Sequence, residues 1–130
     1  MKSKQILVVE DDATLRDLYA ELLRNEGYVV DTAIDGGEAL KKMRFGGWDL
    51  ILLDIMIPGI DGFDVMNVLK DTPPSQPNGP VVYLTNLGGE DNIEKGLEKH
   101  GVKAYWVKSE LTPGQIIQRV KGLIAEYGKL

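Results

Sequence analysis

The chain has 130 residues, of which 43% are hydrophobic and 27% charged, as expected for one globular domain with a proper core. Its net charge of −5 argues against a nucleic-acid-binding surface, which needs a basic patch to displace the counterions of a phosphate backbone. The lack of cysteine excludes disulfides and thiolate metal sites, and no apolar run suits a signal peptide or a membrane span. We therefore expect one cytoplasmic domain over residues 1–130, with no second domain, no direct nucleic-acid binding and no membrane insertion.

In chain order, short apolar runs alternate with segments of helical periodicity. The predicted elements are a strand at 6–9, a helix at 13–26, a strand at 28–33, a helix at 36–45, a strand at 50–53, a short helix at 63–69, a strand at 81–84, a helix at about 91–100, a strand at 104–107 and a helix at 113–127. Asp12 can cap the first helix, and Pro113 can begin the last. The proline-rich residues 72–80 are interpreted as a stiff surface loop rather than a recognition site for a proline-binding domain.

Five strands alternating with five helices indicate an α/β fold, a doubly wound parallel sheet with helices on both faces. The nearly continuous apolar runs fit strands that are buried on both sides. Right-handed crossovers leave few arrangements. A five-stranded flavodoxin-like sheet in the order 2-1-3-4-5 suits a chain of this length.

Charged side chains directly follow three of the predicted strands. Glu10 and Asp11 come after the first strand, Asp54 after the third and Lys108 after the fifth. Because the carboxyl ends of parallel strands meet at one edge of the sheet, these groups should form one site with three carboxylates and one ammonium. An apolar surrounding would tolerate that cluster only with a metal ion or a compensating partner.

Four segments carry a pattern of defined order and spacing. They are ILVVEDDATLR at 6–16, DLILLDIMIPGIDGFDVM at 49–66, Thr85 at the end of the fourth strand, and YWVK at 105–108. Together they resemble the receiver domain of bacterial response regulators, of the single-domain chemotaxis type, over essentially the whole chain. The resemblance implies a protein of two-component signal transduction that is not an enzyme, and the chain is expected to be a receiver domain without an output domain.

The resemblance implies that Asp54 accepts a phosphoryl group from a sensor histidine kinase or a histidine phosphotransfer protein. It also implies a Mg²⁺ (or Mn²⁺) ion held by Glu10, Asp11, Asp54 and the backbone carbonyl of Met56. The chemistry is reasonable by itself, since two unit charges about 4 Å apart repel by roughly 4 kcal/mol at an effective dielectric of about 20. A hard divalent cation bound by oxygens removes that repulsion.

The resemblance further implies that Thr85 and Lys108 contact the phosphoryl oxygens. Thr85 and Tyr105 would form a switch, in which movement of the threonine opens space for the aromatic ring to rotate inward. This would couple the site to the surface of the fourth helix, the fifth strand and the fifth helix, where a downstream protein target would bind.

Two positions depart from the family pattern. Ser109 stands where the family usually has a proline joined by a cis bond, and we favour a trans peptide because a cis bond before another residue costs about 3 kcal/mol or more. Asn86 stands where the family usually has a small residue. It is predicted to cover part of the phosphoryl site and so to slow the access of water and small phosphodonors.

Four further side chains have ordinary structural interpretations. Tyr105 could simply be an aromatic residue of an edge strand, and Trp106 should point to the opposite face and pack in a core. Asp12 is expected to cap a helix rather than bind a metal. His100, predicted at a helix C-terminus, is expected where a positive charge is favoured and is not expected to be catalytic.

Three other functions are alternatives to a phosphorylated receiver. A degenerate receiver would dock partners without phosphorylation, and the residues at 86 and 109 are its support. A phosphatase with an aspartyl-phosphate intermediate is disfavoured, since such enzymes generally need an acid two residues after the nucleophile, where this chain has Met56. A nucleotide or flavin binder is disfavoured because the acidic residues 10–12 in the first turn repel phosphate.

Overall fold

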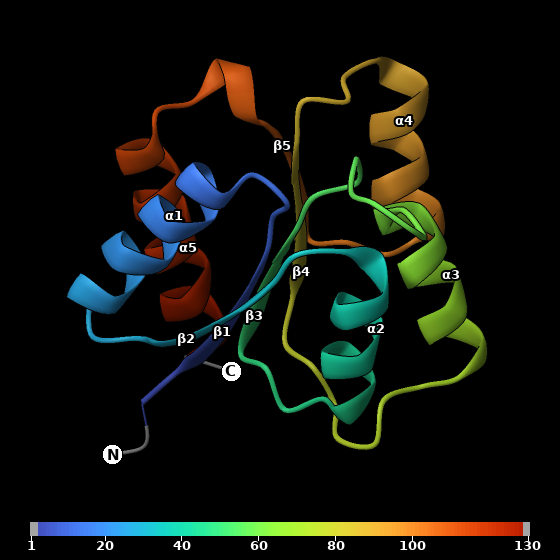
Figure 1. Cartoon of the computed structure of the whole chain (residues 1–130), viewed down its shortest axis with the longest axis horizontal. Coiled ribbons are helices and arrows are strands. Elements are labelled where there is room, and N and C mark those ends of the chain that lie inside the picture. Colours follow the sequence, from blue (N-terminus) through green and yellow to red (C-terminus); the bar gives the residue numbers. More distant parts are fainter. Residues whose placement is uncertain (1–2, 129–130) are drawn as a thin grey trace.

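The computed structural model describes residues 3–128 and has a five-stranded parallel sheet at its centre (Figure 1). The strands are β1 (Gln5–Val9), β2 (Val29–Ala33), β3 (Leu50–Leu53), β4 (Val81–Thr85) and β5 (Ala104–Val107), in the order β2-β1-β3-β4-β5. The predicted fold and strand order are therefore confirmed. The second strand begins at Val29 rather than at residue 28, and the fourth extends to Thr85.

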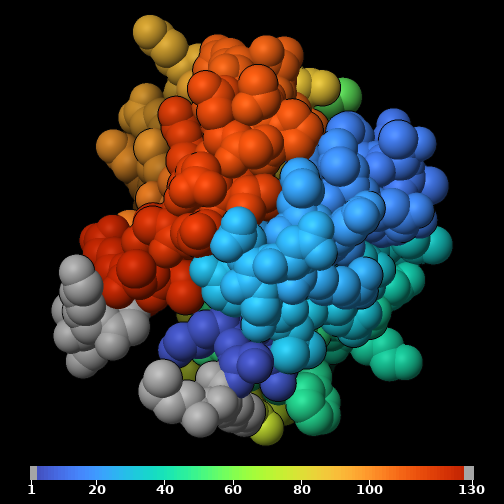
Figure 2. Space-filling model, turned by 90° about the vertical axis from the view of Figure 1, so that its left-hand side faces the viewer, coloured from blue at the N-terminus to red at the C-terminus, as the bar shows by residue number. Residues whose placement is uncertain are grey.

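The helices cover both faces of the sheet (Figure 1). They are α1 (Ala13–Asn25), α2 (Gly36–Phe45), α3 (Gly62–Asp71), α4 (Glu90–Glu94) with the π-helical turn η1 (Lys95–Lys99), the 3-10 turn η2 (Lys108–Glu110) and α5 (Pro113–Gly128). Helices α1 and α5 lie side by side over one face (Figure 2), where Lys121 Nζ is 3.1 Å from Glu26 Oε2. None of the helices within residues 3–128 has the length and apolarity needed to cross a bilayer.

Two hydrophobic cores result, because successive strand residues point to opposite faces. Ile6 and Val8 pack in the core under α1 and α5, whereas Leu7 and Val9 pack in the core under α2 and α3. Trp106 lies in the first core, as its alternation with the neighbouring Tyr105 predicts. Coverage on both sides is why the strands have continuous apolar runs rather than alternating ones.

Local signals set the helix starts nearest the site. Asp12 caps α1 by accepting the backbone N–H of Leu15 at 3.0 Å, which confirms its predicted role. Asp61 and Asp64 form a capping box at the start of α3. Gly62 follows that cap and lies against the strand end, where an added Cβ would stand 2.7 Å from the carbonyl oxygen of Asp54.

The helix predicted from about 91 to 100 is present, but it is not α-helical throughout. The segment begins at Glu90, is α-helical to Glu94 and then widens into the π-helical turn, in which the N–H of His100 donates to the carbonyl of Lys95. The turn places Gly96 against the buried ring of Tyr83, where a Cβ would stand 2.9 Å from ring carbons. The spacing of apolar residues along the helix does not predict this contact with a distant strand, nor the π-helical turn that makes it.

The expectation of a favoured positive charge at His100 is also wrong. Burial lowers the pKa of His100 below its ordinary value, and the charges of Lys95, Lys70 and Lys99 lower it further, against a smaller opposing effect of Asp61. Its Nδ1 is 2.7 Å from the hydroxyl of buried Tyr83, and its Nε2 is 3.1 Å from Asn67 Oδ1. A neutral ring protonated on Nε2 satisfies both contacts.

We expect His100 to make the free energy of unfolding depend on pH. Because its folded pKa lies below the unfolded value of about 6.5, the unfolded chain binds more protons between the two values, and stability falls as pH drops through about 6.5. Urea titrations at several pH values should show a smaller loss in His100→Gln than in the wild type. His100 is the single histidine, so an identical pH dependence in both proteins would contradict this assignment.

Candidate functional site

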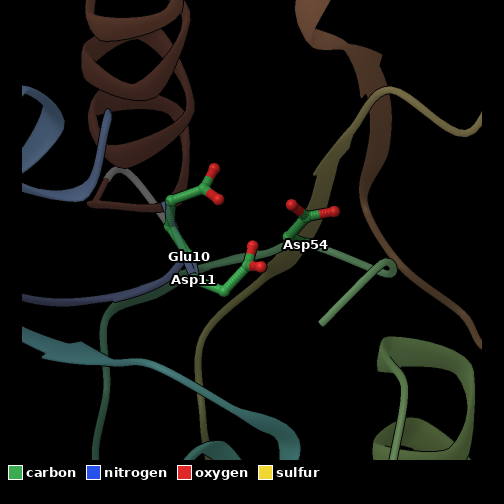
Figure 3. Close-up of side chains that lie close together, drawn as sticks. All are labelled: Glu10, Asp11 and Asp54. Carbon is green, nitrogen blue, oxygen red and sulfur yellow. The ribbon is translucent and has the colours of Figure 1, made fainter. Parts of the chain in front are cut away.

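The three predicted carboxylates meet at the carboxyl edge of the sheet (Figure 3). Glu10 and Asp11 follow β1, and Asp54 follows β3, which pairs with β1 so that Val9 lies opposite Leu53. One oxygen of each carboxylate lies within 4.8 Å of one oxygen of each of the others. Glu10 and Asp54 are buried and Asp11 is exposed, so the cluster opens to solvent on one side.

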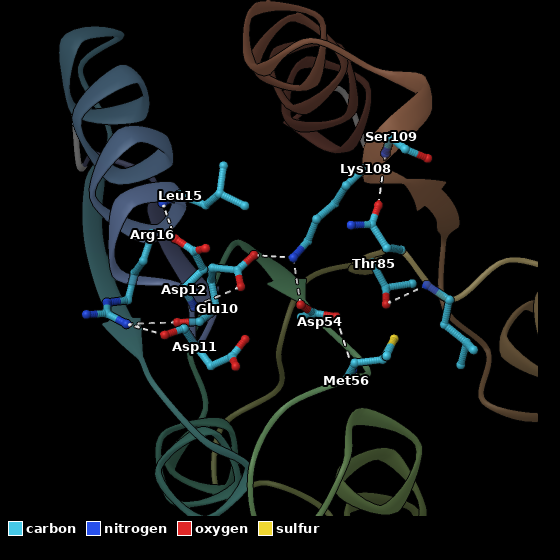
Figure 4. A network of polar contacts seen from close by, with 12 residues as sticks. Glu10, Asp11, Asp12, Leu15, Arg16, Asp54, Met56, Thr85, Lys108 and Ser109 are labelled. Carbon is cyan, nitrogen blue, oxygen red and sulfur yellow. Dashed lines mark hydrogen bonds and ion pairs between the residues drawn. The ribbon is translucent and has the colours of Figure 1, made fainter.

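Lys108 reaches the same cluster from the end of β5 (Figure 4). Its ammonium donates to Asp54 Oδ2 at 2.7 Å and also to Glu10 Oε1, and its side chain is only 10% exposed. Burial alone would lower the pKa of Lys108, but the hydrogen bonds and negative charges of Asp54 and Glu10 raise it above its ordinary value. The ammonium is therefore held in its charged form between two carboxylates.

One ammonium does not balance three carboxylates. Burial raises the pKa of Glu10 above its ordinary value, and the Lys108 ammonium and the backbone N–H of Asp12 offset that effect only in part. The neighbouring charge of Asp54 raises it further. The site therefore carries an excess of negative charge, which a second cation would stabilise.

The carboxylate triad fits a Mg²⁺ site. Mg²⁺ prefers oxygen ligands, commonly takes few carboxylates from the protein and keeps several waters. Glu10, Asp11 and Asp54 supply three such oxygens, and the exposed side of Asp11 leaves space for water.

Backbone contacts fix the two acidic loops. The N–H of Asp54 donates to the Val9 carbonyl at 3.2 Å, and the N–H of Met56 donates to Asp54 Oδ1 at 3.1 Å. Met56 as a whole residue is 59% exposed. Hydrogen bonds thus fix both oxygens of Asp54, one through Met56 and the other through Lys108.

Arg16 belongs to the site, and the sequence analysis did not identify it. Its Nη1 donates to the backbone carbonyl of Glu10 at 3.1 Å and to that of Asp11 at 3.4 Å (Figure 4). From the first turn of α1, Arg16 therefore holds the segment that connects β1 to α1. Its position six residues after Glu10, in the first turn of the predicted helix, is a weak signal that many surface arginines share.

The two predicted switch residues lie on adjacent strands. Thr85 ends β4, is fully buried, and accepts the N–H of Leu87 on its hydroxyl at 3.2 Å. Tyr105 in β5 donates its hydroxyl to the Leu87 carbonyl, and its ring packs edge-on against Tyr83 at 5.7 Å between centroids. Both side chains thus contact the same residue of the loop that follows β4.

The two residues that depart from the family pattern contact each other. The Lys108–Ser109 peptide is trans, as favoured from the sequence, since residues 3–128 contain no cis bond. The N–H of Ser109 donates to Asn86 Oδ1 at 3.0 Å (Figure 4). Asn86 is exposed, and its predicted effect on access to the site stays a prediction.

The family comparison covers most of the chain. The model of the response regulator receiver domain matches residues 6–121. The transcriptional regulatory protein ResD of Bacillus subtilis is 38% identical over 120 residues, which are 92% of this chain and 48% of that protein. The DNA-binding response regulator MtrA of Mycobacterium tuberculosis is 38% identical over 91% of this chain and 49% of that protein. The chain thus spans about half the length of these curated relatives.

Solved structures give the same similarity in three dimensions. A CheY-like receiver domain from Methanospirillum hungatei superposes with a TM-score of 0.85 at 27% identity, covering 98% of both chains. The response regulator TrrA of Thermotoga maritima, solved in complex with Mg²⁺ and BeF, has a TM-score of 0.73 at 36% identity, over 92% of this chain and 98% of that one.

Proposed function

The chain belongs to the response regulator receiver family, and we propose that its Asp54 accepts a phosphoryl group from a sensor histidine kinase or a histidine phosphotransfer protein. The observation that carries this proposal is the position of Asp54, a buried carboxylate at a strand end between two other carboxylates and one ammonium. In the reaction, a carboxylate oxygen of Asp54 forms a bond to phosphorus while the bond from phosphorus to the donor histidine nitrogen breaks.

The proposed metal ligands are Glu10, Asp11, Asp54 and the backbone carbonyl of Met56, with Mg²⁺ or Mn²⁺ as the ion. A bound divalent cation would offset the charge of the incoming phosphoryl group and clamp its oxygens. The residues of the chain do the rest. The N–H of Met56 orients the Asp54 carboxylate, and Arg16 holds the Glu10–Asp11 turn in place.

Lys108 and Thr85 are the proposed contacts to the phosphoryl oxygens. The Lys108 ammonium already donates a hydrogen bond to Asp54. After phosphorylation, one of its N–H groups would donate to a phosphoryl oxygen instead, and its positive charge would attract the phosphate. Thr85 would turn its hydroxyl from the N–H of Leu87 toward the phosphate. The hydroxyl of Tyr105 donates to the carbonyl of the same Leu87, so movement of this loop would also shift the Tyr105 side chain on β5.

The output is proposed to be contact between the surface of α4, β5 and α5 and a downstream protein. The organisation without an output domain and the chemotaxis-type subtype stay predictions, because the relatives that carry regulatory or DNA-binding names are about twice as long as this chain. A second candidate is a receiver that docks without phosphorylation. Ser109 and Asn86, at positions where the family usually has other residues, favour it.

Incubation with acetyl phosphate, followed by intact-mass measurement, tests the proposal directly. We expect a mass gain of one phosphoryl group that requires Mg²⁺ and disappears when the ion is chelated. Beryllofluoride with Mg²⁺ should also shift the NMR signals of the loop after β4. A protein that gains no phosphoryl group and does not respond to beryllofluoride would support the docking module.

Asp11→Asn should weaken Mg²⁺ binding by at least about tenfold, or about 1.4 kcal/mol, because it removes one charged ligand from an oxygen-only site. Isothermal titration with MgCl₂ measures the affinity. Asp12→Asn is the matched control, since it changes the same charge one residue away and asparagine still caps a helix. Equal losses in the two variants would show a general charge effect and contradict the ligand role of Asp11.

A further inference from the structure

Asn86 and Ser109 join two loops just beyond the point where the strands stop pairing. Thr85 lies opposite Val107 in the last pair of the β4–β5 ladder. After it, the hydrogen bond from the N–H of Ser109 to Asn86 Oδ1, 3.0 Å long, continues the connection through a side chain (Figure 4). Asn86 directly follows Thr85, and Ser109 directly follows Lys108, so this bond ties together the backbones next to the two proposed contacts to the phosphoryl oxygens.

Ser109 supplies the donor of this hydrogen bond, and Asn86 supplies the acceptor. Ser109 lies in the first turn of η2 (Lys108–Glu110), where backbone N–H groups have no partner within the helix. A proline at this position would have no N–H to satisfy, and a small residue at position 86 would offer no amide oxygen to receive it. The two departures from the family pattern are thus the donor and the acceptor of one hydrogen bond.

The bond acts on the backbone of Lys108. A planar peptide links the carbonyl carbon of Lys108 to the nitrogen of Ser109, so fixing that N–H fixes the plane from which the lysine side chain begins. The far end of the side chain is held by Asp54 and Glu10. When a phosphoryl group takes over part of that contact, the backbone end becomes the main constraint on a long and flexible side chain.

We propose that Asn86 is a positioning residue, which holds the Lys108–Ser109 peptide so that the Lys108 ammonium stays aimed at Asp54. The proposal rests on the proposed function, since it assigns Asn86 a part in phosphoryl transfer. A positioning role and a covering role predict opposite effects of Asn86 on the rate of phosphorylation by small phosphodonors. A residue that covers the site slows small phosphodonors, whereas a residue that positions Lys108 speeds their reaction.

The first test is the rate of phosphorylation by acetyl phosphate at saturating Mg²⁺. Asn86→Ala should lower the rate about two- to tenfold, as the loss of one hydrogen bond implies. Ser109→Ala keeps the N–H and is the matched control, with an unchanged rate. A higher or unchanged rate in Asn86→Ala would overturn the proposal.

The second test does not need phosphorylation. The ¹⁵N–¹H NMR signal of the Lys108 ammonium should broaden through faster proton exchange in Asn86→Ala, while the signal stays sharp in Ser109→Ala. A bond with a merely structural role would leave the ammonium signal unchanged and change only the free energy of unfolding. If the wild type gains no phosphoryl group, the proposed function fails, yet the ammonium signal still decides whether Asn86 positions Lys108.

Discussion

An Asp54→Asn variant will gain no phosphoryl group from acetyl phosphate or a histidine kinase, whereas the wild type will gain one in the presence of Mg²⁺. The amide is not a nucleophile and carries no charge to bind the cation. The fold should survive, since the amide oxygen still accepts the N–H of Met56 and Lys108 keeps its contact with Glu10. Intact mass measures the phosphoryl group, and circular dichroism measures the fold.

Asp17→Asn is the matched control for this loss. Asp17 is an exposed carboxylate on α1, outside the cluster, and the substitution changes the charge by the same amount. It should be phosphorylated as the wild type is. Phosphorylation of Asp54→Asn at another residue, such as Glu10, would contradict the assignment of Asp54 as the acceptor.

Lys108→Met should lower the free energy of unfolding by about 3–5 kcal/mol without Mg²⁺, the usual cost of removing one partner of a buried ion pair. The substitution leaves Glu10 and Asp54, which are 3% and 5% exposed, without their counterion. Mg²⁺ should recover much of the loss, because a ligand at 100 times its dissociation constant adds about 2.7 kcal/mol of stability. Urea titrations with MgCl₂ and with a chelator measure both effects.

Lys103→Met provides the matched comparison. Lys103 is 39% exposed and lies 3.9 Å from Glu126, so its removal should cost about 1 kcal/mol or less and should not respond to Mg²⁺. Equal losses for the two lysines, or a loss in Lys108→Met that Mg²⁺ leaves unchanged, would show that the ammonium does not take the place of a cation at the site.

The sequence was sufficient to predict the sheet and the central charges. Runs such as Leu50–Leu53 are apolar because helices cover both faces of the strands, and the alternation of Tyr105 with Trp106 places the two rings against the cores on opposite faces of the sheet. The carboxylates and Lys108 could be predicted to meet because parallel strands bring their carboxyl ends to one edge.

Other features depend on contacts between distant elements, which a linear pattern does not record. The π-helical turn packs Gly96 against the ring of Tyr83, and the lowered pKa of His100 follows from its burial beside the same ring. Arg16 looks like an ordinary helix residue until its guanidinium is placed beside the Glu10 carbonyl. In each case the deciding partner lies on another element of the fold.

The bond between Glu10 and Lys108 joins residues 98 positions apart, which has a consequence for how the protein is made. During synthesis, the acidic residues leave the ribosome long before the lysine, and their counterion arrives only when the final strand docks on the sheet. Until then the acidic residues lack this counterion, so the contact forms only after the last strand has been synthesised. Competence to receive a signal is therefore a property of the finished molecule, and incompletely folded copies should stay silent.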